Sequence, residues 1–316
     1  MIYKIVKGRL GNQMFQYAAM RSMQLKYFPN ENMQFYFKLV EKKGDKKDGF
    51  TNTLKDFKII ENIETKKIKM NLLQNIKIIK MLILNFIIKK KNKSHKEYVK
   101  KLQAMETKKQ KNLNKNGVFW YTKGYYNYDF SNIKAKNKIF YGYYESKRYL
   151  EGDIKNVLKE EFSPKYEKLE ENKELYSIIE NNNSVCVSIR RGDFITNPNY
   201  KKNHYICDEN YFREAIDIMN KKIKNPKYVI FSDDIDWVKQ NMKFPRGTVY
   251  ESGKDPVWEK LRLMYNCKHY IISNSSFSWW AQYLSRNNEH KIVIAPKKWL
   301  NNSKNPDIYE DNWILI

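Results

Sequence analysis

The second half of the chain alternates short apolar segments with amphipathic ones, and this alternation limits the possible folds most strongly. The apolar segments predict β-strands at 184–189, 227–232, 247–250, 269–273 and 291–296. Helical patterns occupy the intervals at 208–223, 235–242, 256–267 and 276–286. Strands that are apolar throughout and separated by helices are typical of a parallel sheet covered on both faces. We therefore expect an α/β fold.

Parallel sheets bind ligands at the carboxyl ends of their strands, and three of these ends carry polar side chains. The first strand is followed by Arg190, Arg191 and Asp193 in "SIRRGDF", and the second by Asp233. The fourth is followed by "SNSSFSWWAQYL", residues 273–284. A guanidinium binds phosphate with two parallel hydrogen bonds, and the start of a helix offers free N–H groups to an anion. The pattern predicts a site for a nucleoside diphosphate.

Each of these features also has an ordinary structural explanation. An arginine pair is often surface charge, a serine-rich turn is often only a helix cap, and an aspartate often belongs to a turn. We expect Trp279 and Trp280 to lie in the core rather than to form a sugar platform. The occurrence of three such features at strand ends of one sheet favours a binding site over the ordinary explanations.

The segment "KGRLGNQMFQYA", Lys7 to Ala18, follows the apolar run "IYKIV" and leads into a helical pattern. Two of the 11 glycines, Gly8 and Gly11, lie in this short segment. Glycine tolerates backbone angles that other residues avoid, so a tight strand-to-helix turn is expected. A simple turn would explain the glycines but not Arg9 or Asn12, which we expect to contact a ligand.

The net charge of +25 suggests nucleic-acid binding, but the distribution of charge does not support it strongly. The 60 basic residues comprise 51 Lys and 9 Arg, and the lysines are spread along the chain. Dispersed lysines usually form a solvated surface, and no recognisable nucleic-acid-binding module is present. The three cysteines, Cys186, Cys207 and Cys267, form neither a disulfide framework nor a zinc motif. With no signal peptide recognised at the N-terminus, a cytoplasmic location is expected.

Residues 66–101 form the most basic stretch, with 12 Lys and one Glu. They include "NLLQNIKIIKMLILNFII", residues 71–88, which is interrupted by Lys77, Lys80 and Asn85. These polar residues make a membrane-spanning helix unfavourable. Two interpretations stay open. The segment is either an interfacial helix at an anionic membrane surface or a core helix of the first domain with a lysine-rich end.

A charged helical region between Glu151 and Asn183 separates two differently patterned halves, and Pro164 interrupts it. We therefore predict an N-terminal domain at 1–165, which includes the lysine-rich insert, and a second domain at 166–316.

Four segments together resemble the α-1,2-fucosyltransferases, which form glycosyltransferase family eleven. They are "GRLGNQMFQYA", "GYYESKRYL" at 142–150, "RRGDF" and "NSSFSWWAQYL", and they extend from residue 8 to about residue 300. The resemblance implies a GT-B architecture, with two Rossmann-like domains facing across a cleft. It implies inverting, metal-independent transfer of L-fucose from GDP-L-fucose to the 2-hydroxyl of a terminal galactose. It further implies that the second domain, 166–316, holds most of the donor and that the first domain, 1–165, lies on the acceptor side. No cofactor is expected.

The resemblance also implies roles for individual residues. Arg190 and Arg191 would bind the diphosphate, Asp233 would lie near the nucleoside, and Arg9, Gly11 and Asn12 would approach the donor. Ser275, Ser276 and Phe277 would line the phosphate site. Ser188 stands where many members of the family have a histidine that helps to hold the guanine. Arg190 and Asp193 would be catalytic; Asp193 is either the general base or the side chain that orients an arginine.

Two further classes of function stay open. A different GDP-sugar transferase, or one that uses a metal ion held by Asp234 and Asp236, would share much of this pattern. A basic nucleic-acid-binding protein is the second alternative. The resemblance favours an enzyme that binds neither a metal ion nor nucleic acid. A cytoplasmic enzyme at the inner face of the membrane, acting on lipid-linked bacterial surface glycans, would fit the basic stretch 66–101 and the absence of a recognised signal peptide.

Overall fold

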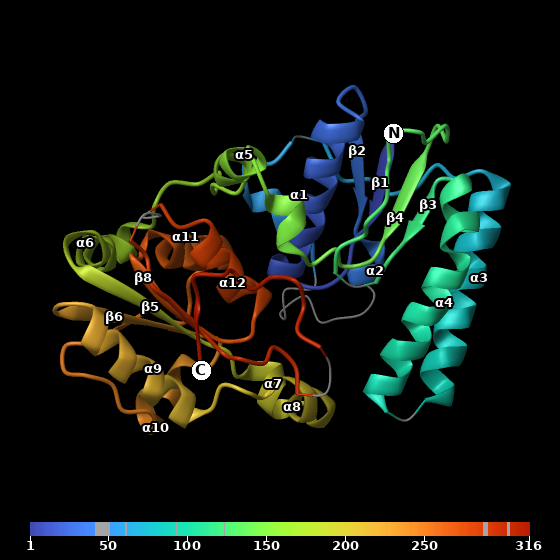
Figure 1. The fold of residues 1–316 in the computed structure, drawn as a ribbon. Helices are drawn as coiled ribbons and strands as arrows, with labels where there is room; N and C mark the ends of the chain where they lie inside the picture. The colour runs from blue at the N-terminus through green and yellow to red at the C-terminus, as the bar shows by residue number, and fades with distance from the viewer. Residues whose placement is uncertain (42–50, 61, 93, 123, 287–289, 302–303) are drawn as a thin grey trace. The chain divides into compact units, whose positions relative to one another are not determined.

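The computed structural model describes residues 1–316 except 42–50, 61, 93, 123, 287–289 and 302–303. The chain forms two compact α/β units (Figure 1). Unit 1 comprises Met1–Lys55, Ile59–Leu158 and Pro306–Ile308, and unit 2 comprises Asp56–Lys58, Lys159–Asn305 and Tyr309–Ile316. The longest segment of unit 1 ends at Leu158, whereas the predicted domain boundary lies at residue 165. Each unit contains a parallel sheet, so the predicted α/β class is confirmed.

The sheet of unit 2 has the strand order β10-β9-β8-β5-β6-β7, and its paired strands are parallel. The strands are β5 (Asn183–Ile189), β6 (Pro226–Ser232), β7 (Val249–Tyr250), β8 (His269–Ile272), β9 (Val293–Ala295) and β10 (Ile314–Leu315). The first five lie close to the predicted strands. Strand β10 was not predicted, because two residues at the end of a chain carry no readable periodicity.

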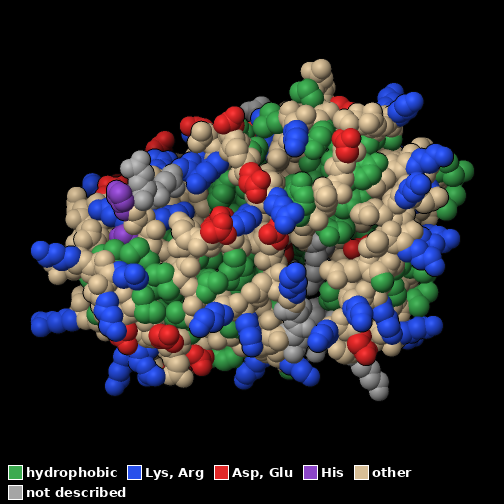
Figure 2. Space-filling view, in the orientation of Figure 1, with side chains coloured by type: hydrophobic (Ala, Val, Ile, Leu, Met, Phe, Trp, Pro, Cys, Tyr) green, Lys and Arg blue, Asp and Glu red, His purple; other side chains and the backbone are tan. Residues whose placement is uncertain are grey.

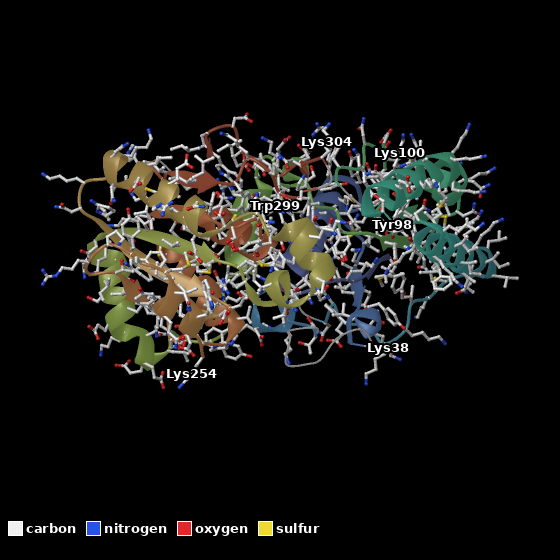
Figure 3. All side chains as sticks on the ribbon, turned by 90° about the horizontal axis from the view of Figure 1, so that it is seen from below. Lys38, Tyr98, Lys100, Lys254, Trp299 and Lys304 are labelled. Atoms are coloured by element: carbon white, nitrogen blue, oxygen red, sulfur yellow. The ribbon has the colours of Figure 1, made fainter. Side chains whose placement is uncertain are left out.

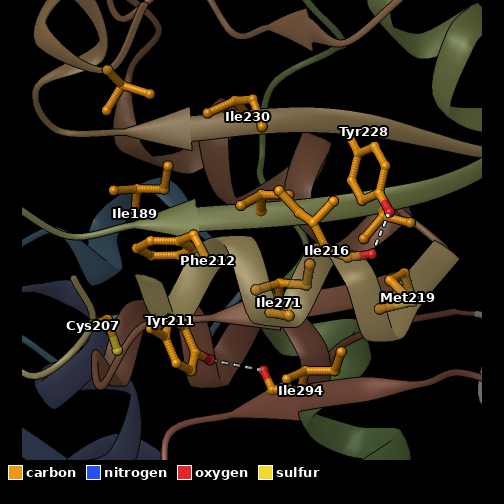
Figure 4. Close-up of a cluster of buried hydrophobic side chains, with 14 of the residues drawn as sticks. Ile189, Cys207, Tyr211, Phe212, Ile216, Met219, Tyr228, Ile230, Ile271 and Ile294 are labelled. Carbon is orange, nitrogen blue, oxygen red and sulfur yellow. Dashed lines mark hydrogen bonds between the residues drawn. The ribbon is translucent and has the colours of Figure 1, made fainter. Parts of the chain in front are cut away.

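Helices accompany these strands as the alternating pattern predicts. They are α6 (Lys173–Asn181), α7 (Gly192–Thr196), α8 (Pro198–His204), α9 (Glu209–Lys222), α10 (Ile235–Asn241), α11 (Val257–Asn266) and α12 (Ser276–Tyr283). Asp208 caps α9 by accepting a 3.0 Å hydrogen bond from the Tyr211 N–H. Phe212 and Ile216 of α9 then pack with Ile230 and Ile271 in the core of the unit (Figure 4). Helices α7 and α8 were not predicted.

Unit 1 contains a four-stranded parallel sheet in the order β2-β1-β4-β3. Its strands are β1 (Ile2–Ile5), β2 (Met33–Tyr36), β3 (Val118–Trp120) and β4 (Lys138–Tyr141). The long helices are α1 (Leu10–Tyr27), α3 (Leu72–Lys91) and α4 (His95–Lys115), with the shorter α2 (Lys38–Glu41). Helix α5 (Ile154–Glu161) begins in unit 1 and ends in unit 2. Short 3₁₀ turns are found at Leu54–Asp56, Lys147–Leu150 and, in unit 2, at Glu170–Asn172.

The predicted apolar segment at 71–88 forms α3, which pairs with α4 (Figure 1). Asn71 and Gln74 form a reciprocal capping box that fixes where the helix begins. Ile78 and Met81 are buried with Val118 and Trp120, so one side of α3 belongs to the core of unit 1. Among the described residues, no helix is both long and apolar enough to cross a membrane. Lys93, which belongs to the basic stretch, lies outside the described residues.

Candidate functional site

The candidate site lies at the carboxyl edge of the sheet in unit 2, where β5, β6 and β8 end side by side. Ile189 of β5 pairs with Ser232 of β6, and Ser188 pairs with Ile272 of β8. The three strands therefore end at the same edge of the sheet. The residues that follow them there include Arg190, Asp233 and Ser273. The predicted meeting of polar side chains at the strand ends of this sheet is observed.

Arg190 is held between two carboxylates. Its Nη1 lies 2.8 Å from Asp233 Oδ2, and its Nη2 donates to Asp193 Oδ1 at 2.5 Å. Asp233 also accepts a 2.8 Å hydrogen bond from the Arg191 N–H, which ties the β5 loop to the β6 loop. The Arg190 side chain remains 23% exposed.

Gly192 allows Asp233 to lie this close to the backbone of the neighbouring loop. A Cβ atom at position 192 would lie 2.3 Å from Asp233 Oδ2 and 3.2 Å from its Cγ. The first distance is shorter than any normal contact, so a side chain at 192 would displace the carboxylate. The glycine of "RRGDF" therefore leaves the space that the Asp233 carboxylate occupies.

Arg191 has partners different from those of Arg190. Its Nε donates to Asp234 Oδ2 at 3.1 Å, and its guanidinium lies 3.1 Å from the centroid of the Trp237 ring. A cation over the face of a tryptophan is a favourable arrangement. Asp234 and Trp237 were not predicted as partners of Arg191, because the sequence alone does not show where the start of α10 lies relative to β5.

Hydrogen bonds of three serine hydroxyl groups connect β5, β8 and α12 next to the backbone of Arg190. Ser273 Oγ donates to the Ser188 carbonyl at 2.7 Å and accepts from the Arg190 N–H at 3.0 Å. The buried Ser188 hydroxyl lies 2.7 Å from that of Ser278 on α12. Ser188 was a predicted donor-binding residue, and its hydroxyl is used here to hold α12 against the sheet. Ser273 and Ser278 were missed, although the serine-rich run 273–278 contained the signal.

The remaining predicted residues of unit 2 lie at the start of α12. Ser275 is the N-cap residue, and Ser276 and Phe277 begin the helix; all three are partly exposed. Trp279 and Trp280 are fully buried, and Trp280 packs edge-to-face on Phe162 with ring centroids 5.1 Å apart. The expectation that the tryptophan pair belongs to the core is confirmed.

The described residues contain no group of three or more His, Cys, Asp or Glu side chains placed to hold a metal ion. Asp234, the first residue of the Asp-Ile-Asp motif, is instead paired with Arg191. Metal-independent chemistry stays a prediction. The three cysteines are buried free thiols.

In unit 1, the segment that carries Arg9, Gly11 and Asn12 forms the expected turn between β1 and α1. Gly8 adopts a φ of 76°, and a Cβ atom there would lie 2.4 Å from Asn12 Nδ2, so glycine is required. Arg9 is the N-cap residue of α1, and Gly11 is buried in its first turn. The predicted contact of Arg9, Gly11 and Asn12 with a donor stays a prediction.

A family model described as glycosyl transferase family 11 matches residues 1–316. The chain belongs to glycosyl transferase family 11. It is 35% identical over 189 residues to an alpha-1,2-colitosyltransferase of Escherichia coli, covering 56% of this chain and 62% of that protein. It is 32% identical over 141 residues to the Escherichia coli O-antigen biosynthesis glycosyltransferase WbnK, covering 44% and 46% of the two chains. Human galactoside alpha-(1,2)-fucosyltransferase 1 is 29% identical over 104 residues, which is 32% of this chain and 28% of that one.

These matches span less than two thirds of each curated relative. Among solved structures, Escherichia coli ADP-heptose lps heptosyltransferase II is similar with a TM-score of 0.42 at 11% identity, covering 100% of this chain and 89% of that one. Arabidopsis thaliana FUT1 in complex with GDP gives a TM-score of 0.42 at 9% identity, covering 94% and 71% of the two chains.

Unit 1 of this family 11 chain contains a buried carboxyl that the sequence did not reveal. Glu106 on α4 is 2% exposed, and its Oε2 accepts a 3.4 Å hydrogen bond from the Thr122 N–H. Burial raises the pKa of Glu106 to about 7, and the hydrogen bond from Thr122 and the charge of Lys7 only partly oppose the rise. One glutamate in a lysine-rich helix gives no signal in the sequence; its burial alone distinguishes it.

The Gly192→Ala substitution tests the close contact with Asp233. We expect the added methyl group to lower the free energy of unfolding by about 1–3 kcal/mol, because it overlaps the Asp233 carboxylate. In an Asp233→Ala background the overlapping atoms are gone, and the same substitution should cost under about 1 kcal/mol. Urea unfolding of the four proteins measures both values. Equal costs in the two backgrounds would contradict the contact.

The Glu106→Gln substitution tests the raised pKa. The folded protein keeps the Glu106 proton up to about pH 7, whereas the unfolded chain releases it near the ordinary glutamate pKa of 4.5. The stability that this group contributes is therefore complete below about pH 4.5 and is lost as the pH rises through 7. Glutamine does not titrate. We expect the stability of the variant, relative to wild type, to rise by about 2–3 kcal/mol between pH 4.5 and pH 8 in urea unfolding. If the free energies of unfolding of the two proteins changed in parallel with pH, the raised pKa of Glu106 would be refuted.

Proposed function

We propose that this family 11 glycosyltransferase transfers L-fucose from GDP-L-fucose to the 2-hydroxyl of a terminal galactose in a glycan, with inversion and without a metal ion. Family membership supports a glycosyltransferase, and one relative is named a galactoside alpha-(1,2)-fucosyltransferase. The observation that carries the proposal is the position of Arg190, partly exposed at the edge where β5, β6 and β8 end.

The proposed chemistry follows from charge. As the bond between the sugar and GDP breaks, negative charge grows on the leaving diphosphate. A guanidinium keeps its charge and has five N–H donors, so Arg190 can hold Asp193 and Asp233 and still donate to phosphate. Backbone N–H groups at Ser275–Phe277, at the start of α12, would add to this stabilisation. Arg191, Ser188 and Asp233 belong to the same proposed donor site. Arg9, Gly11 and Asn12 of unit 1 are also proposed to contact the donor.

Asp193 is the proposed general base for the acceptor hydroxyl, and its salt bridge with Arg190 supports the alternative role of orienting the guanidinium. The two roles differ in their consequences. A base must accept a proton from the acceptor in the transition state, so its protonation state sets the pH dependence of the rate. A side chain that only orients Arg190 changes the rate without changing that dependence.

The proposed acceptor is a galactose-terminated glycan, including a lipid-linked precursor of a bacterial surface polysaccharide. We place the enzyme in the cytoplasm, at the inner face of the membrane. The basic stretch 66–101 supports this location.

A second donor is supported by one observation. The relative with 35% identity is named a colitosyltransferase, and colitose is fucose without its 3-hydroxyl. Incubation with GDP-L-fucose or GDP-colitose and a panel of β-galactosides, in excess EDTA, would distinguish the donors. Product linkage determined by NMR completes the test. Transfer only after a divalent metal ion is added, or no transfer from either donor, would overturn the proposal.

The Arg190→Ala substitution tests the phosphate contact. We expect kcat/KM for the donor to fall roughly a hundredfold or more, on the order of 3 kcal/mol, because one charge-assisted contact to the leaving group is lost. Arg213→Ala is the matched control, since Arg213 is an exposed arginine on α9 of the same unit. Near-normal turnover by a folded Arg190→Ala enzyme would defeat the assignment.

The Asp193→Asn substitution separates the two roles of Asp193. If Asp193 is the base, we expect kcat to fall by about a hundredfold or more and the acidic limb of the pH–rate profile to disappear. A mild loss with an unchanged profile would instead assign Asp193 to the orientation of Arg190. Steady-state rates between pH 5 and pH 9 provide the measurement.

A further inference from the structure

Helix α3 exposes an unusual amount of apolar surface. Eight of the large hydrophobic side chains found exposed in the described part of the chain lie on this helix, with Leu72 at 75% and Phe86 at 66% exposure. They are Leu72, Leu73, Ile76, Ile79, Leu82, Ile83, Phe86 and Ile87. Soluble proteins rarely leave a continuous apolar patch of this kind open to water.

The exposed side chains form a continuous stripe. Positions 72, 76, 79, 83 and 86 follow one another at steps of four and three, so they share one side of the helix. The opposite side carries the buried Gln74, Ile78 and Met81. Ile78 and Met81 pack in the core of unit 1. Tyr98, which Figure 3 labels on α4, donates a 2.8 Å hydrogen bond to Asn85 of α3. One side of α3 thus packs against unit 1. Its other side is also apolar but is exposed to solvent.

Lysines surround this stripe. Exposed lysines precede the helix (Lys66, Lys67, Lys69), lie on it (Lys80), follow the stripe (Lys89, Lys90, Lys91) and continue on α4 (Lys96, Lys100, Lys101). Blue lysine atoms border green apolar atoms at the edge of unit 1 where α3 and α4 lie (Figure 2). Glu97 is the one acidic residue among the described residues of 66–101. The like charge disfavours a second copy of this chain as the occupant of the stripe and favours an anionic surface.

We propose that α3 lies flat in the surface of an anionic lipid bilayer. The outer apolar stripe enters the boundary between head groups and acyl chains, and the lysines contact the anionic head groups. The stripe runs from Leu72 to Ile87, so at 3.6 residues per turn it offers about four turns of contact parallel to the membrane plane. The buried side of α3 stays in the core of unit 1, and no rearrangement of that unit is needed. This inference is independent of the sugar that the enzyme transfers.

Vesicle sedimentation of the full chain tests the proposal. We expect binding to phosphatidylcholine vesicles that contain 30% phosphatidylglycerol, and at least tenfold weaker partitioning to phosphatidylcholine alone. The combined Ile79→Ser, Ile83→Ser and Phe86→Ser variant should partition at least tenfold more weakly to the anionic vesicles. The matched control combines Leu25→Ser and Val257→Ser, which remove exposed apolar side chains elsewhere and should leave partitioning unchanged.

A site-specific probe locates the contact. The three native cysteines are buried, so a single cysteine introduced at the surface can be labelled selectively. An environment-sensitive fluorophore on Ile83→Cys should brighten and shift to the blue when the anionic vesicles are added. The same fluorophore on Leu25→Cys should not respond. Thermal unfolding of each variant confirms that the fold is retained.

Three results would overturn the proposal. The first is equal sedimentation of the serine variant and wild type with anionic vesicles. The second is a fluorophore at position 83 that does not respond to them. The third is a concentration-dependent dimer in analytical ultracentrifugation that the three serine substitutions abolish, because the stripe would then be covered by a second copy.

Discussion

The candidate site depends on the pairing of Arg190 with Asp193 and Asp233 at the edge of a parallel sheet. The guanidinium joins residues that follow two different strands, and Arg191 adds a backbone hydrogen bond to the same Asp233 carboxylate. Gly192 provides the space that this carboxylate occupies. Two carboxylates already orient this one charged side chain, so little side-chain entropy would be lost if it bound the proposed diphosphate.

Hydrogen bonds and close contacts of single polar side chains also fix the backbone next to the arginines and in unit 1. The hydroxyl groups of Ser273 and Ser188 link β5, β8 and α12, and Ser273 also accepts a hydrogen bond from the backbone of Arg190. In unit 1, Gly8 and Asn12 shape the turn between β1 and α1 in the same way that Gly192 and Asp233 shape the turn after β5. At both positions a Cβ atom would overlap one neighbouring polar side chain, and Gly8 in addition adopts a φ of 76°.

The order of elements was predictable where the apolar pattern was long and regular. Five strands and four helices of unit 2 lie close to their predicted positions, and the tryptophan pair is in the core. Helices α7 and α8 were missed because they are short and polar, with no buried residue in α7 to give periodicity. For 71–88 the sequence left two interpretations, and α3 has features of both: one side is in the core and the other carries exposed apolar residues.

The sequence by itself determined the α/β class, the residue types at the strand ends and the family, because these follow from local patterns and short motifs. Only the tertiary structure decided which side chains pair. Arg190 and Asp233 are joined by the register of β5 against β6, and Arg191 is placed on Trp237 by the packing of α10. Register and helix packing depend on the burial of distant apolar side chains, and a local pattern does not encode them. The raised pKa of Glu106 has the same origin, since burial is a property of the folded chain.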